Sequence, residues 1–162
     1  MDALSALHAS DQFAPSGRTS TFQRSGVAGY RQIVLAPIYI YMQEQFVKAV
    51  GAHGLWKGRL TGAIKTGSSE FTVEDAAADN QCEFGKWLYS VHNTGVESKD
   101  YHEKVRLLHA TFHQEVSRVL SLALAGKRAA ALKAMEDGSP YAGSSASLTL
   151  EMMSWAKTEV AQ

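Results

Sequence analysis

Residues 99–124, KDYHEKVRLLHATFHQEVSRVLSLAL, indicate the fold class of this chain. Their apolar residues recur at steps of three and four, which is the period of one buried face of an amphipathic helix. That face is made up of Val105, Leu108, Phe112, Val116 and Val119. Gly126 follows the pattern and predicts the C-terminal end of the helix. The stretch therefore predicts a helix of about seven turns with one face in a hydrophobic core.

Helical periodicity also occurs on both sides of this stretch, and the sequence shows no alternating strand pattern. A capping start near Thr72 and the turn around Gly138 mark two of the boundaries. The predicted helices are 37–63, 72–92, 99–124, a short piece at 127–135, and 141–160. Four main helices with short connections are typical of a bundle. We expect an all-α fold, an antiparallel four-helix bundle with an extra short helix and an N-terminal extension.

The first part of the chain differs in composition from the rest. Residues 1–36 are rich in Ser, Gly, Thr and Arg, and we interpret them as an N-terminal extension that is flexible or ordered by a partner. Residues 37–162 are long enough for one domain with a sizeable core. The chain begins without a recognisable secretory signal. We therefore expect a single bundle domain after residue 36.

Charge and cysteine content exclude several classes of function. Sixteen basic and sixteen acidic residues cancel, so no net charge attracts nucleic acid or an anionic membrane. The longest apolar run, 33–42, contains Pro37 and is shorter than the roughly 20 residues of a membrane span. The chain has one cysteine, Cys82, which excludes an intramolecular disulfide and fits a reducing, cytoplasmic location.

Potential metal ligands lie on three of the predicted helices. His109 and His113 are one helical turn apart and share a face, so both imidazoles reach one ion. His53 and Cys82 each lie in an apolar helical pattern. Three histidines and one thiolate form a four-ligand set that suits zinc. His102 lies seven residues before His109, about 10 Å away along the helix, so we exclude it from the set.

Each of these residues also has a plainer interpretation. A single buried histidine is often a hydrogen-bonded core residue, and a single cysteine often a small buried hydrophobic residue. Trp56 and Trp87 fit core packing. Gly85 follows Cys82 by about one turn and costs about 1 kcal/mol relative to alanine, which is easier to explain beside a tight site. We therefore expect Trp56, Gly85 and Trp87 to support a metal site, and the combination favours metal over core packing.

Three segments carry a family resemblance. They are His53-Gly-Leu-Trp56, Cys82-Glu-Phe-Gly85-Lys86-Trp87 and His109-Ala-Thr-Phe-His113. With them the chain, from about residue 38 to its end, resembles the bacterial chemoreceptor zinc-binding domain, of which the cysteine segment is the most specific part. The resemblance implies a four-helix bundle, often dimeric, that holds zinc with His53, Cys82, His109 and His113. It implies a sensor of zinc or oxidants beside a chemoreceptor signalling domain or a diguanylate cyclase domain, although no output domain is recognisable here.

The resulting prediction is a stand-alone, cytoplasmic, zinc-binding sensory or regulatory domain and not an enzyme. We expect it to sense zinc or oxidants such as hypochlorous acid in chemotaxis or cyclic-di-GMP signalling, with Cys82 as the redox-sensitive residue. A homodimer and a chemoreceptor or diguanylate cyclase are the expected partners. One alternative is a structural bundle that mediates oligomerisation. Another is an enzyme with Cys82 as its nucleophile and a histidine as its base, although no oxyanion loop is recognisable.

Overall fold

The computed structural model describes residues 25–91 and 99–158. These residues contain six helices and no strand, so the predicted all-α class is confirmed. The helices are α1 (Ser25–Thr66), α2 (Val73–Ala77), α3 (Glu83–Ser90), α4 (Lys99–Leu124), α5 (Arg128–Lys133) and α6 (Pro140–Thr158). The bounds of α4 match the predicted 99–124.

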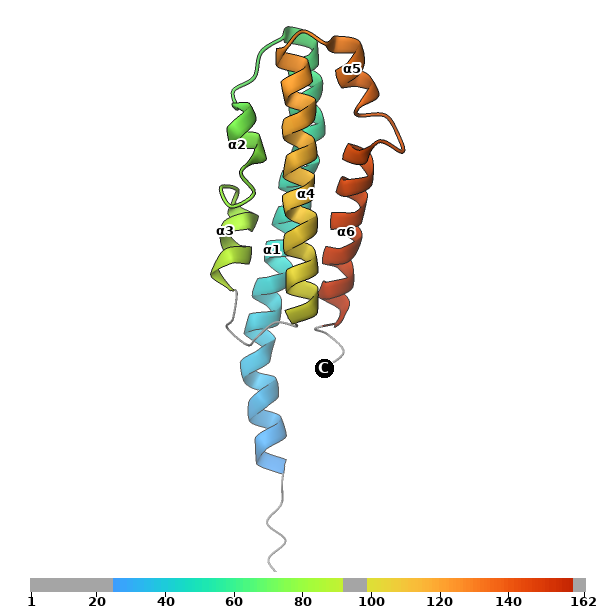
Figure 1. The fold of residues 1–162 in the computed structure, drawn as a ribbon. Coiled ribbons are helices and arrows are strands. Elements are labelled where there is room, and N and C mark those ends of the chain that lie inside the picture. The colour runs from blue at the N-terminus through green and yellow to red at the C-terminus, as the bar shows by residue number, and fades with distance from the viewer. Residues whose placement is uncertain (1–24, 92–98, 159–162) are drawn as a thin grey trace, which may run out of the picture.

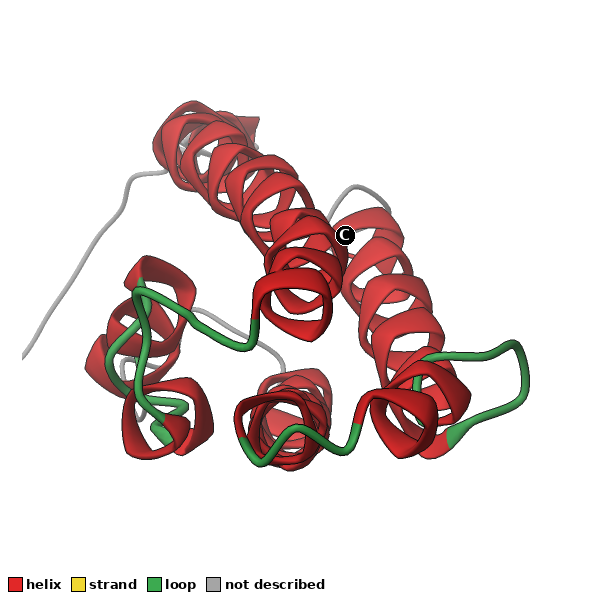
Figure 2. Cartoon of the chain, turned by 90° about the horizontal axis from the view of Figure 1, so that it is seen from above, coloured by secondary structure: helices red, strands yellow, loops and turns green. Residues whose placement is uncertain are grey.

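The three long helices and one pair of short helices form a four-cornered bundle. Helices α1, α4 and α6 lie alongside one another, while α2 and α3 follow each other along the fourth corner (Figures 1 and 2). Consecutive corners run in opposite directions, as the colours of Figure 1 show. Helix α4 packs against both α6 and α2, and α3 packs against α1 and α4. The N-terminal part of α1 extends beyond the other helices (Figure 1).

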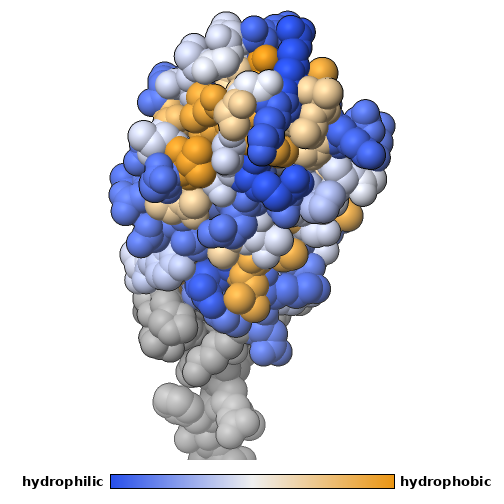
Figure 3. Space-filling model, turned by 45° about the horizontal axis from the view of Figure 1, so that its top comes forward, coloured by the Kyte–Doolittle hydropathy of each residue, from blue (hydrophilic) through white to orange (hydrophobic). Residues whose placement is uncertain are grey.

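The apolar face predicted from 99–124 does form the centre of the core. Its members Val105, Phe112, Val116 and Val119 are fully buried, while Leu108 is only partly buried. The facing helices contribute Met42, Phe46, Ala49, Leu60 and Ala63 from α1, and Leu148, Met152 and Trp155 from α6. Burial of these side chains provides most of the driving force for the bundle. On the face drawn in Figure 3, the described apolar residues form small separate patches among hydrophilic ones.

Helix α4 ends where the sequence predicts. Gly126 adopts a left-handed conformation with φ of 71°. Its N–H donates to the carbonyl of Ala123 at 3.1 Å, and the N–H of Lys127 donates to the carbonyl of Leu122 at 2.9 Å. These bonds satisfy carbonyls that the end of the helix leaves open, and glycine adopts this conformation without steric cost.

The prediction of one helix over 72–92 is wrong. The segment forms two short helices, α2 and α3, separated by residues 78–82. Thr72 begins α2 with the predicted capping box, because its hydroxyl accepts from the Asp75 N–H and its own N–H donates to the Asp75 carboxylate. Ala78 is extended and ends α2, and Cys82 is extended and begins α3. A second N-cap therefore interrupts an apolar pattern that looks continuous in the sequence.

The predicted start of the first helix near Pro37 is also wrong, since α1 begins at Ser25. A proline inside a helix removes one hydrogen bond and costs about 3 kcal/mol, yet α1 continues through Pro37. Residues 1–24 lie outside the described part of the chain, so the division into 1–36 and 37–162 stays a prediction. Among the described residues, no helix combines the length and the apolar character that crossing a membrane requires.

Candidate metal centre

The structure brings all four predicted ligands together. His53 lies in the middle of α1, His109 and His113 lie one turn apart on α4, and Cys82 immediately precedes α3. One ligand atom from each residue lies within 4.8 Å of every other. Residues from three separate parts of the chain therefore converge at one point inside the bundle.

Two of the imidazoles are anchored by backbone carbonyls. His53 Nδ1 lies 2.6 Å from the carbonyl oxygen of Ala49, one turn earlier on α1. His113 Nδ1 lies 2.8 Å from the carbonyl oxygen of Ala76 on α2. A carbonyl only accepts, so Nδ1 carries the proton and Nε2 keeps its lone pair. Both Nε2 atoms are buried without a hydrogen-bond partner, as they would be if they held a metal ion.

His109 is held mainly by ring packing. Its Nε2 lies 3.3 Å from the sulfur of Cys82, and its Nδ1 is buried without a hydrogen-bond partner. Its ring meets the rings of His113 and His53 edge-on, at centroid distances of 4.6 and 5.0 Å, and that of Phe84 at 5.3 Å. An unpartnered buried nitrogen costs about 1–3 kcal/mol. The unpartnered Nε2 atoms of His53 and His113, in a cluster that also includes His109 and the sulfur, fit a cation that uses their lone pairs.

Cys82 differs from the histidines in being only partly buried. Its sulfur accepts a hydrogen bond from the Gly85 N–H at 3.2 Å and so caps the N-terminus of α3. Burial raises the pKa of the thiol above its ordinary value. Without a metal ion the sulfur is therefore protonated near neutral pH, and binding a metal releases this proton.

Burial lowers the pKa of all three histidines. Desolvation is the largest cause in each case, and it brings the pKa of His53 to about 4 and that of His109 to about 2. The pKa of His113 is also lowered by desolvation, against a raising effect of its bond to Ala76. The imidazoles are therefore neutral at pH 7, the form that binds zinc. Three neutral nitrogens and one sulfur fit the tetrahedral four-ligand set of zinc.

Gly85 lies where the backbone passes very close to the centre. A Cβ atom at this position would overlap the carbonyl oxygen of Asp79 and lie 3.1 Å from His109 Cε1. The sequence suggested a close approach of a facing helix. The structure shows that Asp79, in the segment between α2 and α3, supplies the two closest atoms and His109 on α4 the third.

Trp56 and Trp87 lie in the core beside the centre. Trp56 packs against Phe71 at a centroid distance of 5.1 Å and against His113 at 6.5 Å. Trp87 stacks on Phe84 at 5.5 Å. Both tryptophans are buried, which agrees with their interpretation as packing residues.

His102 lies apart from the cluster, as its spacing from His109 predicts. It is buried, and its Nε2 lies 2.8 Å from the carbonyl oxygen of Leu88 in the last turn of α3. Its ring meets that of Trp155 edge-on at 5.9 Å. It joins α4 to the C-terminal end of α3 and not to the metal centre.

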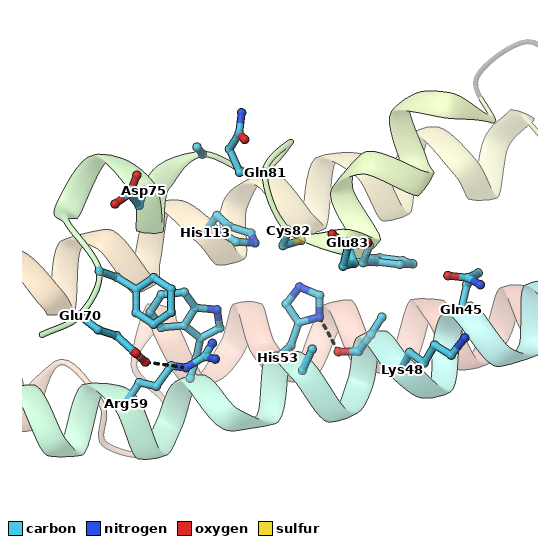
Figure 4. A pocket seen from close by; sticks show the side chains of 16 residues that line it. Gln45, Lys48, His53, Arg59, Glu70, Asp75, Gln81, Cys82, Glu83 and His113 are labelled. Atoms are coloured by element: carbon cyan, nitrogen blue, oxygen red, sulfur yellow. Dashed lines mark hydrogen bonds and ion pairs between the residues drawn. The ribbon is translucent and has the colours of Figure 1, made fainter.

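A groove leads from the surface to the centre, and the sequence did not reveal it. It has a volume of about 760 Å³ and lies between α1 and residues 70–84. Figure 4 shows His53 pointing from α1 across the groove toward Cys82 and His113. His109 is absent from its lining. The anchoring carbonyls of Ala49 and Ala76 were also missed, because a backbone acceptor has no signature in the sequence.

A family model matches the middle part of the chain. Residues 53–120 match the family described as the chemoreceptor zinc-binding domain. The match begins at His53 and includes Cys82, His109 and His113. Neither the curated proteins nor the solved structures contain a significant match to the chain. The match to the chemoreceptor zinc-binding domain thus spans all four of these residues, which are positioned to bind a zinc ion.

Proposed function

We propose that this chain is a sensory domain that responds to zinc or to oxidants, such as hypochlorous acid, through Cys82. The observation that carries the proposal is the unequal placement of the four ligands. Three buried imidazoles belong to the long helices α1 and α4, whereas the sulfur belongs to a short separate segment and is only partly buried. The ligand most exposed to reagents is thus also the one on the smallest structural unit.

Zinc bound by four protein ligands stabilises the fold and keeps the sulfur as a thiolate. A thiolate gives two electrons to hypochlorous acid: the sulfur takes up the chlorine, hydroxide leaves, and water then replaces chloride to give a sulfenic acid. The oxidised sulfur is a weaker ligand than the thiolate. Oxidation of Cys82 would therefore leave the three histidines in place and release one side of the site.

The response would reach the surface through α3. The Cys82 sulfur also caps this helix of eight residues, so a change at the sulfur alters a metal ligand and a helix cap together. At its other end α3 is tied to α4 by His102. We propose that α3 shifts or frays on oxidation while α1 and α4 keep their positions.

Two measurements test this function. Elemental analysis of the purified protein should find stoichiometric zinc, and less in a Cys82→Ser variant. Hydrogen exchange of the zinc-loaded chain should show that oxidant accelerates exchange in α3 and leaves the middle of α4 protected. The Cys82→Ser variant should show no acceleration. If it responds to oxidant as the parent does, Cys82 is not the sensor.

The 3.3 Å separation between Cys82 Sγ and His109 Nε2 favours one alternative, a Cys/His enzyme with the thiol as nucleophile. That alternative needs a histidine that accepts a proton near neutral pH, whereas burial holds the pKa of His109 near 2. A closed four-ligand zinc site also leaves no position for substrate. Activity that survives full removal of zinc would support the enzyme.

We further propose a homodimer that contacts its partner copy through α1. The outer face of this helix exposes Val47 by 72% and Leu55 by 60%, beside the exposed glycines 51, 54, 58 and 62. The same helix extends beyond the bundle (Figure 1). A Leu55→Glu variant should become monomeric in analytical ultracentrifugation while keeping its zinc. A zinc-free dimer would instead favour the alternative of a purely structural oligomerisation bundle.

The single thiol also supports a proposal for the cellular location of the protein. A single reduced thiol fits the cytoplasm, and we propose a chemoreceptor or a diguanylate cyclase as the signalling partner. Co-purification with each candidate, in zinc-loaded and oxidised forms, tests the choice. A partner that binds both forms equally receives no signal, because a ligand shifts an equilibrium only by its differential affinity.

A further inference from the structure

The groove beside the metal centre has a floor and a mouth with different chemistry. At the floor lie His53, Cys82 and His113. The lining also includes Ala52 on α1, Arg59 two turns further along α1, and Glu70 on the chain before α2. Arg59 and Glu70 lie at the end of the groove that we call its mouth (Figure 4). The groove thus joins solvent to three of the four metal ligands.

The other sides of the centre are closed by packed side chains. Phe112 and His109 on α4 have no exposed surface, and Phe84 is exposed by only 4%. Helix α3 packs against both α1 and α4. Interiors of this density exclude even small solutes unless the structure opens. Within the described residues, the groove is therefore the open side of the metal centre.

One side chain bridges the mouth of this groove. The Arg59 guanidinium carbon lies 5.2 Å from the centroid of the Trp56 ring and 4.7 Å from that of Phe71. Its Nε lies 3.9 Å from a carboxylate oxygen of Glu70. Figure 4 shows this pair joining α1 to the segment before α2. Helix α2 itself packs against α4 and makes no close backbone contact with α1. Arg59 thus links two walls that the helices themselves leave apart.

We propose that this groove is the route by which divalent cations and small thiol reagents reach the metal centre, and that Arg59 sets its width. The proposal rests on the proposed function only in that the centre binds zinc. It adds a role for residues that contact neither the metal nor the sulfur. The four ligands would determine the equilibrium affinity for zinc. The groove would determine how fast zinc and thiol reagents enter and leave the site.

The charges of the lining suit such a route. Two cations, Lys48 and Arg59, face three anions, Glu70, Asp75 and Glu83. Lys48 lies 3.9 Å from Glu44 and Glu83 lies 2.8 Å from Lys86, so these charges are locally balanced. A nearly neutral wall admits hydrated cations and uncharged reagents alike, because neither meets a strong opposing field.

Two substitutions with opposite expected effects test the route. Ala52 is exposed on the groove wall, so Ala52→Trp should narrow the groove without disturbing the core. Arg59→Ala should remove the bridge and widen it. The assay follows the transfer of zinc from the loaded protein to excess pyridylazoresorcinol. We expect this transfer to become about fivefold faster in Arg59→Ala, the scale of one exposed cation–π contact. In Ala52→Trp it should become about fivefold slower. Equilibrium zinc content should stay at the parental value in both.

Matched controls separate the route from general effects. Ala146→Trp places the same side chain on an exposed position of α6, and Arg118→Ala removes an arginine paired with Glu115 on α4. Both should exchange zinc at the parental rate. Circular dichroism should show an unchanged helix content in all four variants. Arg59→Lys, which keeps the charge without the planar group, should resemble Arg59→Ala.

A second readout keeps this proposal distinct from the zinc function. Cys82 is the single thiol of the chain, so the release of thionitrobenzoate from Ellman's reagent by the metal-free protein reports its accessibility alone. The same order of rates should appear: Arg59→Ala fastest, Ala52→Trp slowest. Parental rates for both groove variants in both assays would overturn the route. Failure of the parent to hold zinc would contradict the proposed function and leave this thiol measurement decisive.

Discussion

The two sides of the metal centre are built from different kinds of structure. The histidines belong to α1 and α4, helices of 42 and 26 residues, and two of their rings are tied to backbone carbonyls. Cys82 ends the non-helical segment 78–82 and caps a helix of eight residues, where its sulfur accepts a hydrogen bond from the Gly85 N–H. The histidine side is therefore preorganised by the bundle. The sulfur side depends on a short segment, the kind of unit that opens at low free-energy cost.

The largest effect should come from removing the preorganised side. A His109→Ala/His113→Ala double variant should lose its zinc, and with it the zinc-dependent rise in melting temperature. Structural zinc sites contribute on the order of 10–16 kcal/mol of apparent free energy, so this rise should be large in the parent. Elemental analysis and thermal melts with and without chelator provide the measurement. His102→Ala, which lies outside the cluster, should keep its zinc.

Low pH should weaken the same side in the metal-free protein. The pKa of His53 falls from its ordinary value of 6.5 in the unfolded chain to about 4 in the folded one. Between these values the unfolded chain takes up a proton that the folded chain does not, so stability decreases as the pH falls from 6.5 toward 4. His53 alone accounts for a loss of about 3 kcal/mol. Urea unfolding across this range measures it, and a flat profile would contradict a neutral, buried His53.

A smaller effect should follow from filling the close contact between the two sides. Gly85→Ala places a Cβ against the Asp79 carbonyl and the His109 ring, and we expect a loss of about 1–3 kcal/mol in the free energy of unfolding. Gly143 on α6 is exposed and has no atom within 4 Å of such a Cβ, so Gly143→Ala should instead stabilise the helix by about 0.5–1 kcal/mol. Chemical denaturation of both variants compares the two. Equal effects would mean that Gly85 is not constrained by packing.

The smallest effect should isolate the helix cap on the sulfur side. Cys82→Ser loses the zinc ligand but keeps an oxygen that accepts the Gly85 N–H, whereas Cys82→Ala loses both. Without metal, the alanine variant should therefore be about 1 kcal/mol less stable than the serine variant. Zinc content should be reduced in both. Identical denaturation midpoints would mean that the sulfur does not cap α3.

The contrast between the two sides also explains which features the sequence predicts. The periodic face of 99–124 gave α4 its bounds, because a long amphipathic helix carries many repeats of the same signal. His109 and His113 belong to that helix, and their spacing of one turn already implied that both imidazoles reach one ion. The break at 78–82 was missed because Cys82 is an uncommon cap residue and the apolar pattern continues past it. Pro37 and the nearby glycines suggested a boundary that the longer helix α1 does not have.

Other parts of the site have no counterpart in a residue pattern. The carbonyls of Ala49 and Ala76 orient two imidazoles, but every residue has a carbonyl, so only three-dimensional placement identifies these two. The Arg59 bridge depends on Glu70 and Phe71, which follow the turn after α1. Such contacts across a turn depend on the path of the loop, which periodicity does not encode.

The solitary thiol at the groove limits how this protein can return to its starting state. A sulfenic acid on Cys82 has no second cysteine in the chain with which to condense. Any disulfide that forms must join this chain to another molecule, and its reduction must likewise come from outside. In the proposed oxidant response, the duration of the oxidised state would therefore depend on the thiol pool around the protein.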